Sequence, residues 1–126
     1  MESGRLEVYR GVDDKPVSLG EVGRICEQEY VDFKEKYLVY RELREANLVV
    51  TPGIKFGCDF AVYEHGPGID HAPYLIQVVK PGEPITATWI ILSGRLATTV
   101  RKQFILALAD VERSRVDFIS FDWWRA

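Results

Sequence analysis

The hydrophobic and polar positions of this chain predict a helical first part. Ser18 precedes Glu21 by three residues, which is the spacing of a helix capping box, and the chain then reads as helical through to Ala46. From Phe33 onward, apolar residues recur at intervals of three and four, as on one face of an amphipathic helix. Asn47 is a residue type that commonly follows the last turn of a helix. We therefore expect the helix to end there.

The rest of the chain shows short apolar runs separated by Gly and Pro, which is typical of strands. Strands are predicted at 48–51, 60–63 and 74–79. The last of these is a nearly continuous apolar run, as expected of a central strand covered on both faces. Residues 6–9 fit a short strand, and the aromatic run 116–124 favours a terminal strand.

The region between the central and terminal strands leaves two interpretations open. Residues 86–92 fit either a strand or the entry to the next helix, and residues 93–107 read as helical. Residues 104–109 taken alone also fit a buried strand, and length does not decide between the two. In either case the order of elements predicts an α/β fold, a mixed β-sheet flanked by helices.

Composition limits the size and the partners of the protein. A chain of 126 residues with 47% hydrophobic residues fits one compact domain with a real core. Its 19 acidic residues outnumber 16 basic ones, giving a net charge of −3. Proteins that bind RNA over a long footprint are usually basic. Any RNA contact is therefore expected to use a local patch or a partner's positive surface.

Cysteine spacing and hydropathy indicate the compartment. Cys26 and Cys58 show neither metal-ligand spacing nor a disulfide framework, so we expect two buried thiols. The sequence contains no signal peptide and no apolar run long enough to cross a bilayer. We expect a soluble, cytoplasmic protein with no membrane partner, nuclear only in a eukaryote.

Three ionisable residues form a set that can cut RNA without a metal. Tyr63 ends a predicted strand, His71 follows a Gly- and Pro-rich loop, and Lys102 lies in the predicted helix. One group would take the proton of a ribose 2′-OH, another would protonate the leaving 5′-oxygen, and a cation would stabilise the phosphorus oxygens. Each also has an ordinary interpretation, as a strand-end tyrosine, a surface histidine and a solvated lysine. His65 is a competing histidine without a motif around it.

The segment from about Tyr37 to Arg125 resembles the catalytic domain of tRNA-splicing endonucleases. The residues that carry the resemblance are Tyr37-Leu-Val-Tyr-Arg-Glu-Leu-Arg44, Gly53-Ile-Lys-Phe-Gly57, Asp59-Phe-Ala-Val-Tyr63, His71-Ala-Pro-Tyr-Leu75, Arg95, Val100-Arg-Lys102 and Trp124-Arg125. The resemblance implies a restriction-endonuclease-like catalytic domain over residues 37–126. Residues 1–36 would then be a short N-terminal segment, the remnant of an N-terminal domain or the link to one.

The resemblance also implies an activity and a role for each residue of the set. Tyr63 corresponds to the general base, His71 to the general acid, and Lys102 to the cation that stabilises the transition state. The implied enzyme is a tRNA-intron lyase that cleaves precursor tRNA at bulge-helix-bulge sites. It would leave 2′,3′-cyclic phosphate and 5′-OH ends, and it would use no cofactor and no metal.

Further residues correspond to RNA contacts in the family. Arg95 would stack on a base of the bulge, and seven residues of one helix would place it on the same face as Lys102. Three residues of the last strand are candidates for its companion: Trp123, Trp124 and Arg125. Lys55 lies between Gly53 and Gly57, which read as turn glycines, and it is a candidate for a phosphate contact.

The family assembles through an acidic loop before the last strand. Asp110 and Glu112 are the candidate docking residues here, with an ordinary charged turn as the alternative. Ile119, Phe121 and Trp123 would give the last strand an apolar edge that pairs with another subunit. The expected assembly is a heterotetramer with a structural subunit, or a homodimer of this chain.

Two other functions remain open at this point. One is a non-catalytic structural subunit of the same assembly, which has no reason to keep Tyr63, His71 and Lys102 together. The other is a metal-dependent DNA nuclease on a similar sheet, which EDTA would inactivate.

Overall fold

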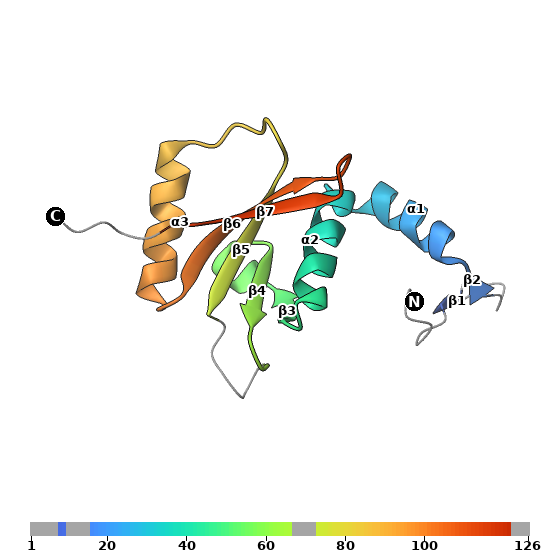
Figure 1. Ribbon diagram of the computed structural model, residues 1–126, viewed down its shortest axis with the longest axis horizontal. Coiled ribbons are helices and arrows are strands. Elements are labelled where there is room, and N and C mark those ends of the chain that lie inside the picture. The colour runs from blue at the N-terminus through green and yellow to red at the C-terminus, as the bar shows by residue number, and fades with distance from the viewer. Residues whose placement is uncertain (1–7, 10–15, 67–72, 122–126) are drawn as a thin grey trace. The chain divides into compact units, whose positions relative to one another are not determined.

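The computed structural model describes residues 8–9, 16–66 and 73–121 (Figure 1). It divides into two compact units, Met1–Phe33 and Lys34–Ala126, and each is described by itself. The predicted His71, Trp123, Trp124 and Arg125 lie outside the described residues. No helix in the described part of the chain is long and apolar enough to span a membrane.

The first unit holds a two-stranded antiparallel sheet and one helix. Its elements are β1 (Val8–Tyr9), β2 (Pro16–Val17) and α1 (Leu19–Glu29). The predicted cap of α1 is confirmed, because the Ser18 hydroxyl oxygen accepts a hydrogen bond from the Glu21 amide at 3.2 Å. The prediction of one helix through to Ala46 is wrong. The chain leaves helical geometry after Glu29, and Asp32 has φ of 55°, so a second helix starts afresh.

The second unit holds a five-stranded mixed sheet and two longer helices. In chain order its elements are α2 (Phe33–Glu45), β3 (Val49–Pro52), the short 3-10 helix η1 (Ile54–Phe56), β4 (Phe60–Tyr63), β5 (Tyr74–Val79), α3 (Ala87–Thr99), β6 (Gln103–Asp110) and β7 (Arg115–Ser120). The strand order is β3-β4-β5-β6-β7. Only β5 and β6 are parallel neighbours, and the other pairs are antiparallel. The predicted mixed sheet with flanking helices is confirmed.

The structure resolves the ambiguous region as helix followed by strand. Thr86 caps α3, since its hydroxyl oxygen accepts a hydrogen bond from the Trp89 amide at 3.1 Å. The helix ends at Thr99 and β6 begins at Gln103, so the expectation of a helix over 93–107 is wrong. The buried-strand interpretation of 104–109 is the right one.

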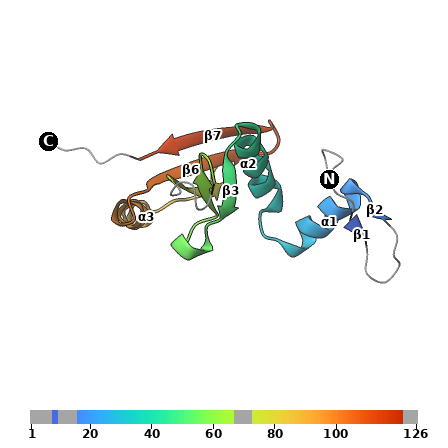
Figure 2. The same cartoon turned by 90° about the horizontal axis from the view of Figure 1, so that it is seen from below.

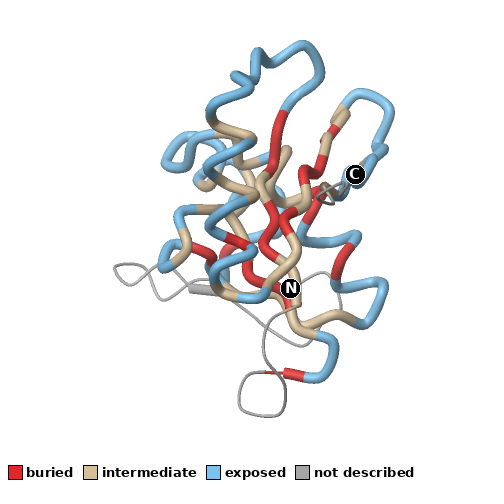
Figure 3. Tube along the Cα trace, turned by 90° about the vertical axis from the view of Figure 1, so that its left-hand side faces the viewer, coloured by how far each residue is buried: buried red, intermediate tan, exposed pale blue. Residues whose placement is uncertain are grey.

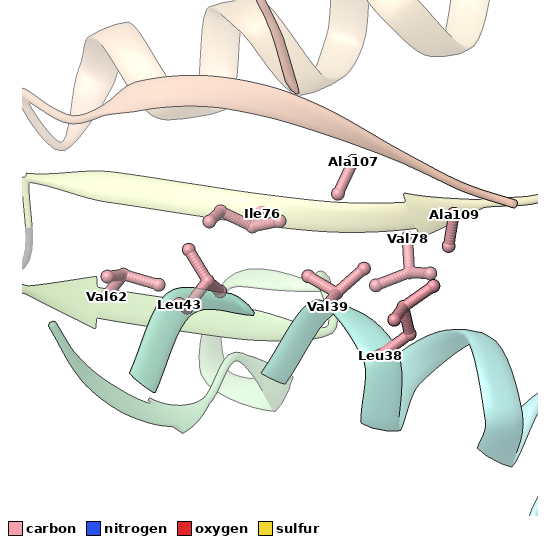
Figure 4. Packing of buried hydrophobic residues seen from close by; sticks show 8 residues of the cluster. All are labelled: Leu38, Val39, Leu43, Val62, Ile76, Val78, Ala107 and Ala109. Carbon is pink, nitrogen blue, oxygen red and sulfur yellow. The ribbon is translucent and has the colours of Figure 1, made fainter. Parts of the chain in front are cut away.

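One face of the sheet, the α2 face, packs against α2 (Figure 4). Leu38, Val39 and Leu43 of α2 meet strand side chains, including Ile76 and Val62. Val39 and Val62 are fully buried. The buried stretches run along the strands, while the turns between elements are exposed (Figure 3).

The opposite face, the α3 face, packs against α3 (Figures 1 and 2). Ala97 of α3 lies over a row of strand residues, Ala61, Leu75 and Phe104. Trp89 meets the Phe104 ring edge-on with centroids 5.6 Å apart. Because residues alternate between faces along each strand, a residue's position in the register decides which helix it faces.

The edge strand β7 carries exposed apolar side chains. Phe118 and Ile119 are 45% and 46% exposed. They pair with Ala107 and Leu106, so they lie on the α2 and α3 faces respectively. Phe121, which the sequence placed at the apolar edge of this strand, packs partly inward. It is half-buried and stacks on Phe104 with centroids 5.9 Å apart.

Candidate active site

The strand register brings Tyr63 and Lys102 to one end of the sheet. Ala61, Leu75 and Phe104 are direct neighbours across β4, β5 and β6. Two residues further along the same face, Tyr63, Pro73 and Lys102 continue this alignment. We call these three residues the terminal row. The Gln103 amide donates a hydrogen bond to the Pro73 carbonyl at 2.8 Å, which holds the row together at its centre.

The residues of the terminal row stand on neighbouring strands and are open to solvent. Neighbouring strands lie about 4.8 Å apart, so the backbones of Tyr63 and Lys102 stand about 10 Å apart with β5 between them. Both positions are half-buried and open to solvent. The row thus places a phenol on one side of β5 and an ammonium on the other side.

Lys102 is placed by the end of α3 and not by the helix itself. The Lys102 amide donates to the Ala97 carbonyl at 2.7 Å, and the Arg101 amide donates to the Thr98 carbonyl at 3.0 Å. These two bonds form a Schellman motif, which closes the helix and turns the chain into β6. Arg101 takes the left-handed position with φ of 58°. The prediction that Lys102 and Arg95 share one helix face is therefore wrong.

Arg95 remains an exposed residue of α3. Because α3 ends at Thr99, Arg95 lies more than one helical turn before the terminus, whereas Lys102 lies beyond it. Their relative placement is set by the Schellman turn and no longer by helical periodicity. The candidate companions of Arg95 fall outside the described residues.

An aromatic ring lies beneath the Lys102 ammonium. The Lys102 Nζ stands 5.3 Å from the centroid of the Phe56 ring, and the Lys55 Nζ stands 6.0 Å from the same centroid. Phe56 belongs to η1 and packs into the α3 face of the sheet. A cation over a ring face is attracted by the ring quadrupole. Phe56 thus gathers two positive charges beside the terminal row.

The turn that carries Phe56 depends on two glycines. A Cβ on Gly53 would stand 2.6 Å from the Cys58 Sγ and 2.8 Å from the Cys58 carbonyl oxygen, so no larger residue fits. Gly57 has φ of 73° and ends η1. The interpretation of both as turn glycines is confirmed. The ring of Phe56 was missed as a functional residue, although a lone aromatic bracketed by turn glycines next to Lys55 is the signal that could have identified it.

Cys58 and Asp59 complete this corner of the sheet. Cys58 and Cys26 are both free thiols, and both are half-buried and not fully buried as expected. Burial raises the pKa of the Cys58 thiol, and the neighbouring Asp59 charge raises that pKa further. Asp59 accepts a hydrogen bond from the Val78 amide at 2.9 Å and lies 3.5 Å from the Lys36 Nζ. Its carboxylate thus links β4, β5 and α2.

The residues on either side of the undescribed loop are anchored to the sheet. The Tyr74 hydroxyl lies 3.4 Å from a carboxylate oxygen of Glu64, the residue after Tyr63. His65 follows and is exposed. His71 precedes Pro73 by two residues in the sequence, and its own placement lies outside the described residues.

The acidic residues before the last strand lie at the far end of β6. Asp110 accepts a hydrogen bond from the Arg113 amide at 3.3 Å, and the Arg113 guanidinium lies 3.7 Å from the same carboxylate. Glu112 is exposed. An open hollow of about 500 Å³ borders this turn. Within the described residues, no group of three or more His, Cys, Asp or Glu side chains is placed to hold a metal ion.

The chain matches one protein family. Residues 33–118 match the model of the tRNA intron endonuclease catalytic C-terminal domain, a range that includes Tyr63, His71 and Lys102.

Several curated proteins are similar to this chain over nearly all of its length. The tRNA-splicing endonuclease of Hyperthermus butylicus is 44% identical over 123 residues, which cover 98% of this chain and 67% of that protein. The tRNA-splicing endonuclease of Pyrobaculum aerophilum is 40% identical over 124 residues, again 98% and 67% of the two chains. That of Sulfurisphaera tokodaii is 42% identical over 123 residues, covering 98% and 67%. The chain therefore spans about two thirds of the length of these relatives.

Proposed function

We propose that this chain, which belongs to the tRNA intron endonuclease family, is a catalytic RNA endonuclease that removes introns from precursor tRNA. The substrate we propose is a bulge-helix-bulge junction, cut without a metal ion to leave 2′,3′-cyclic phosphate and 5′-OH ends. The observation that carries the proposal is the terminal row. It puts a phenol and an ammonium on the same face at one end of the sheet, and we propose that the scissile phosphodiester lies between them.

Tyr63 and Lys102 of the terminal row, together with His71, each have a step in the proposed reaction. The Tyr63 oxygen takes the proton of the ribose 2′-OH, so that the 2′-oxygen attacks the neighbouring phosphorus. Negative charge then grows on the phosphorus oxygens, and the Lys102 ammonium stabilises it. His71 donates a proton to the leaving 5′-oxygen, because an imidazole exchanges protons readily near neutral pH. The 2′-oxygen is the nucleophile, so the product must be a 2′,3′-cyclic phosphate.

The contact between Lys102 and Phe56 supports the role given to Lys102. A long flexible ammonium must be held still to stabilise a transition state, since only preorganised charge avoids reorganisation during the reaction. The ring at 5.3 Å restrains the ammonium through the attraction between a cation and a ring face. Lys55, over the same ring at 6.0 Å, is proposed to contact a neighbouring phosphate.

The proposed RNA contacts extend beyond the terminal row. Arg95 is exposed on α3, and we propose that its planar guanidinium stacks on a bulge base with a companion from Trp124 or Arg125. A local cationic surface of this kind agrees with the net charge of −3, because it needs few basic residues.

We also propose that the chain works as part of an assembly. Edge strand β7 exposes Phe118 and Ile119 on its two faces, and such an edge is a template for pairing with another chain. Asp110 and Glu112 are the proposed docking residues at the other end of β6. The partner is a structural subunit in a heterotetramer, or a second copy of this chain.

The proposal is tested by single-turnover cleavage of a bulge-helix-bulge RNA. Lys102→Ala should lower the cleavage rate by roughly a hundredfold or more, the usual cost of losing a preorganised charge, with RNA binding nearly unchanged. Lys34→Ala is the matched control, because it removes one lysine from an exposed position on α2. Equal rates for the two variants would remove Lys102 from the mechanism. A wild-type chain that binds the RNA but never cuts it, alone or with a partner, would identify a structural subunit instead.

A further inference from the structure

A glutamine interrupts the apolar α3 face of the central strand. Leu75 and Val79 are buried on this face, and Gln77 lies between them on the same side of β5. Gln77 is half-buried, and its side-chain amide forms no hydrogen bond with any residue that the structure describes. Within the described ranges the structure leaves no buried side-chain polar atom without a partner, so the Gln77 amide is open to solvent. It can therefore bond to a ligand that enters from this face.

Gln77 faces a hollow of about 170 Å³ between η1, the sheet and α3. Three aromatic side chains, Phe56, Trp89 and Phe104, form much of its wall, and Ser93 of α3 adds a hydroxyl. The rim is apolar, with Leu92 60% exposed and Leu96 43% exposed. The hollow thus combines flat apolar walls with a donor and an acceptor at its floor.

The hollow lies next to the terminal row on the same face of the sheet. Leu75 and Phe104, which line it, are two residues along their strands from Pro73 and Lys102. Two residues of strand span about 7 Å, a distance that one nucleotide bridges. Phe56 is shared, because its ring lines the hollow and also carries the Lys102 ammonium at 5.3 Å.

We propose that this hollow binds one unstacked pyrimidine base of the RNA, adjacent to the phosphate held by the terminal row. The proposal rests on the proposed function and specifies its substrate. A cavity of about 150 Å³ holds one benzene ring, so a hollow of about 170 Å³ has room for a single six-membered ring, and a bicyclic purine would project out of it. Aromatic walls stack on the base, and the Gln77 amide bonds to its edge.

The first test varies the base and the hollow together. Single-turnover cleavage is measured on bulged RNAs that carry a pyrimidine, a purine or an abasic site at each bulge position in turn. At one position wild type should cut the pyrimidine substrate about tenfold faster than the abasic one, since stacking of one base contributes about 1–3 kcal/mol. It should also cut the pyrimidine substrate faster than the purine one, because only the smaller ring fits within the hollow. Gln77→Met removes the amide at similar volume, and Ser93→Leu fills the hollow. Both should lose the preference. Thr88→Leu, on an exposed position of the same helix, should keep it.

The second test does not depend on cleavage. The side-chain amide signals of Gln77 are followed by NMR while cytidine monophosphate is titrated into wild type and into Ser93→Leu. A shift in wild type that Ser93→Leu abolishes supports the base site even if no RNA is cut, in which case the proposed function alone fails. If the nucleotide causes no shift, the base site is overturned. If the signals shift with protein concentration alone, the base site is also overturned, and the hollow is then a contact between subunits.

Discussion

The Schellman motif that delivers Lys102 to the terminal row gives a sharp prediction about Arg101. This residue has φ of 58° at the position where helices most often place glycine. A side chain in left-handed geometry costs about 1–2 kcal/mol, whereas glycine adopts it freely. Glycine in turn loses about 0.5–1 kcal/mol more backbone entropy on folding. Arg101→Gly should therefore stabilise the second unit by about 0.5–1 kcal/mol.

The matched control is Arg101→Ala, which removes the same charge but keeps the Cβ. Its stability should stay within about 0.5 kcal/mol of wild type, because the strain of left-handed geometry remains. For a folding unit of this size, 1 kcal/mol moves the melting temperature by about 4–8 °C. Thermal unfolding followed by circular dichroism should place Arg101→Gly about 2–8 °C above Arg101→Ala.

Two results would refute this reasoning. If the glycine and alanine variants melt together, Arg101 is not strained and the Schellman geometry does not fix Lys102. If Arg101→Gly is more stable but cuts RNA far more slowly than Arg101→Ala, the position of Lys102 depends on the rigidity of this turn and not only on the path of its backbone. We expect equal cleavage rates for both variants, because the Arg101 side chain has no role in the proposed chemistry.

Three further predictions follow from other contacts. Gly53→Ala should lower the free energy of unfolding by about 1–3 kcal/mol or more, since the new Cβ meets the Cys58 Sγ at 2.6 Å and a backbone oxygen at 2.8 Å; an unchanged urea midpoint would contradict this. Burial raises the pKa of the Cys58 thiol above its ordinary 9.0, so the unfolded state loses that proton first. Stability should be full below about pH 9 and fall above it, and Cys58→Ala should reduce the fall; an equal fall in the variant would contradict the account. Asp110→Lys combined with Glu112→Lys should break the assembly, as seen by light scattering, and abolish cleavage; a monomeric wild type with full activity would refute this docking role.

The sequence predicted elements well where local signals agree with the fold. The central strand 74–79 and the strand 60–63 have the predicted bounds, because their apolar runs end at Gly, Pro or polar turns. Asn47 ends α2 with φ of 63°, a geometry that asparagine tolerates. The Ser18 cap was readable for the same reason, since capping depends on residues three apart.

The errors arose where tertiary structure overrides local preference. β6 is largely buried beneath both helices, so its sequence shows no alternation and reads as a continuation of α3. Arg101 gives no sign of a helix end because glycine, the usual marker, is absent there. The break at Asp32 is likewise a left-handed position without a glycine, so the sequence did not indicate the end of the first helix.

The sequence indicated candidate members of the site but not their arrangement. Tyr63 and Lys102 were identified through the family's motifs, and the strand register that aligns them became visible only in the sheet. The contact between Lys102 and Phe56 joins residues that are 46 positions apart, and no local pattern connects them. Gln77 likewise shares its hollow with Trp89 of α3, which is 12 positions away. Such long-range contacts depend on the strand register, because a shift of one residue would move each side chain to the opposite face of the sheet.

The central claim is that a tyrosine and a lysine at one end of this sheet cut RNA through the ribose 2′-oxygen. The most direct measurement is end-group analysis of a bulge-helix-bulge RNA cleaved in EDTA, by the chain alone or with its co-purified partner. The account predicts undiminished cleavage, with a 2′,3′-cyclic phosphate on the upstream fragment and a 5′-OH on the downstream one. Loss of cleavage in EDTA, or fragments with 3′-OH and 5′-phosphate ends, would contradict it.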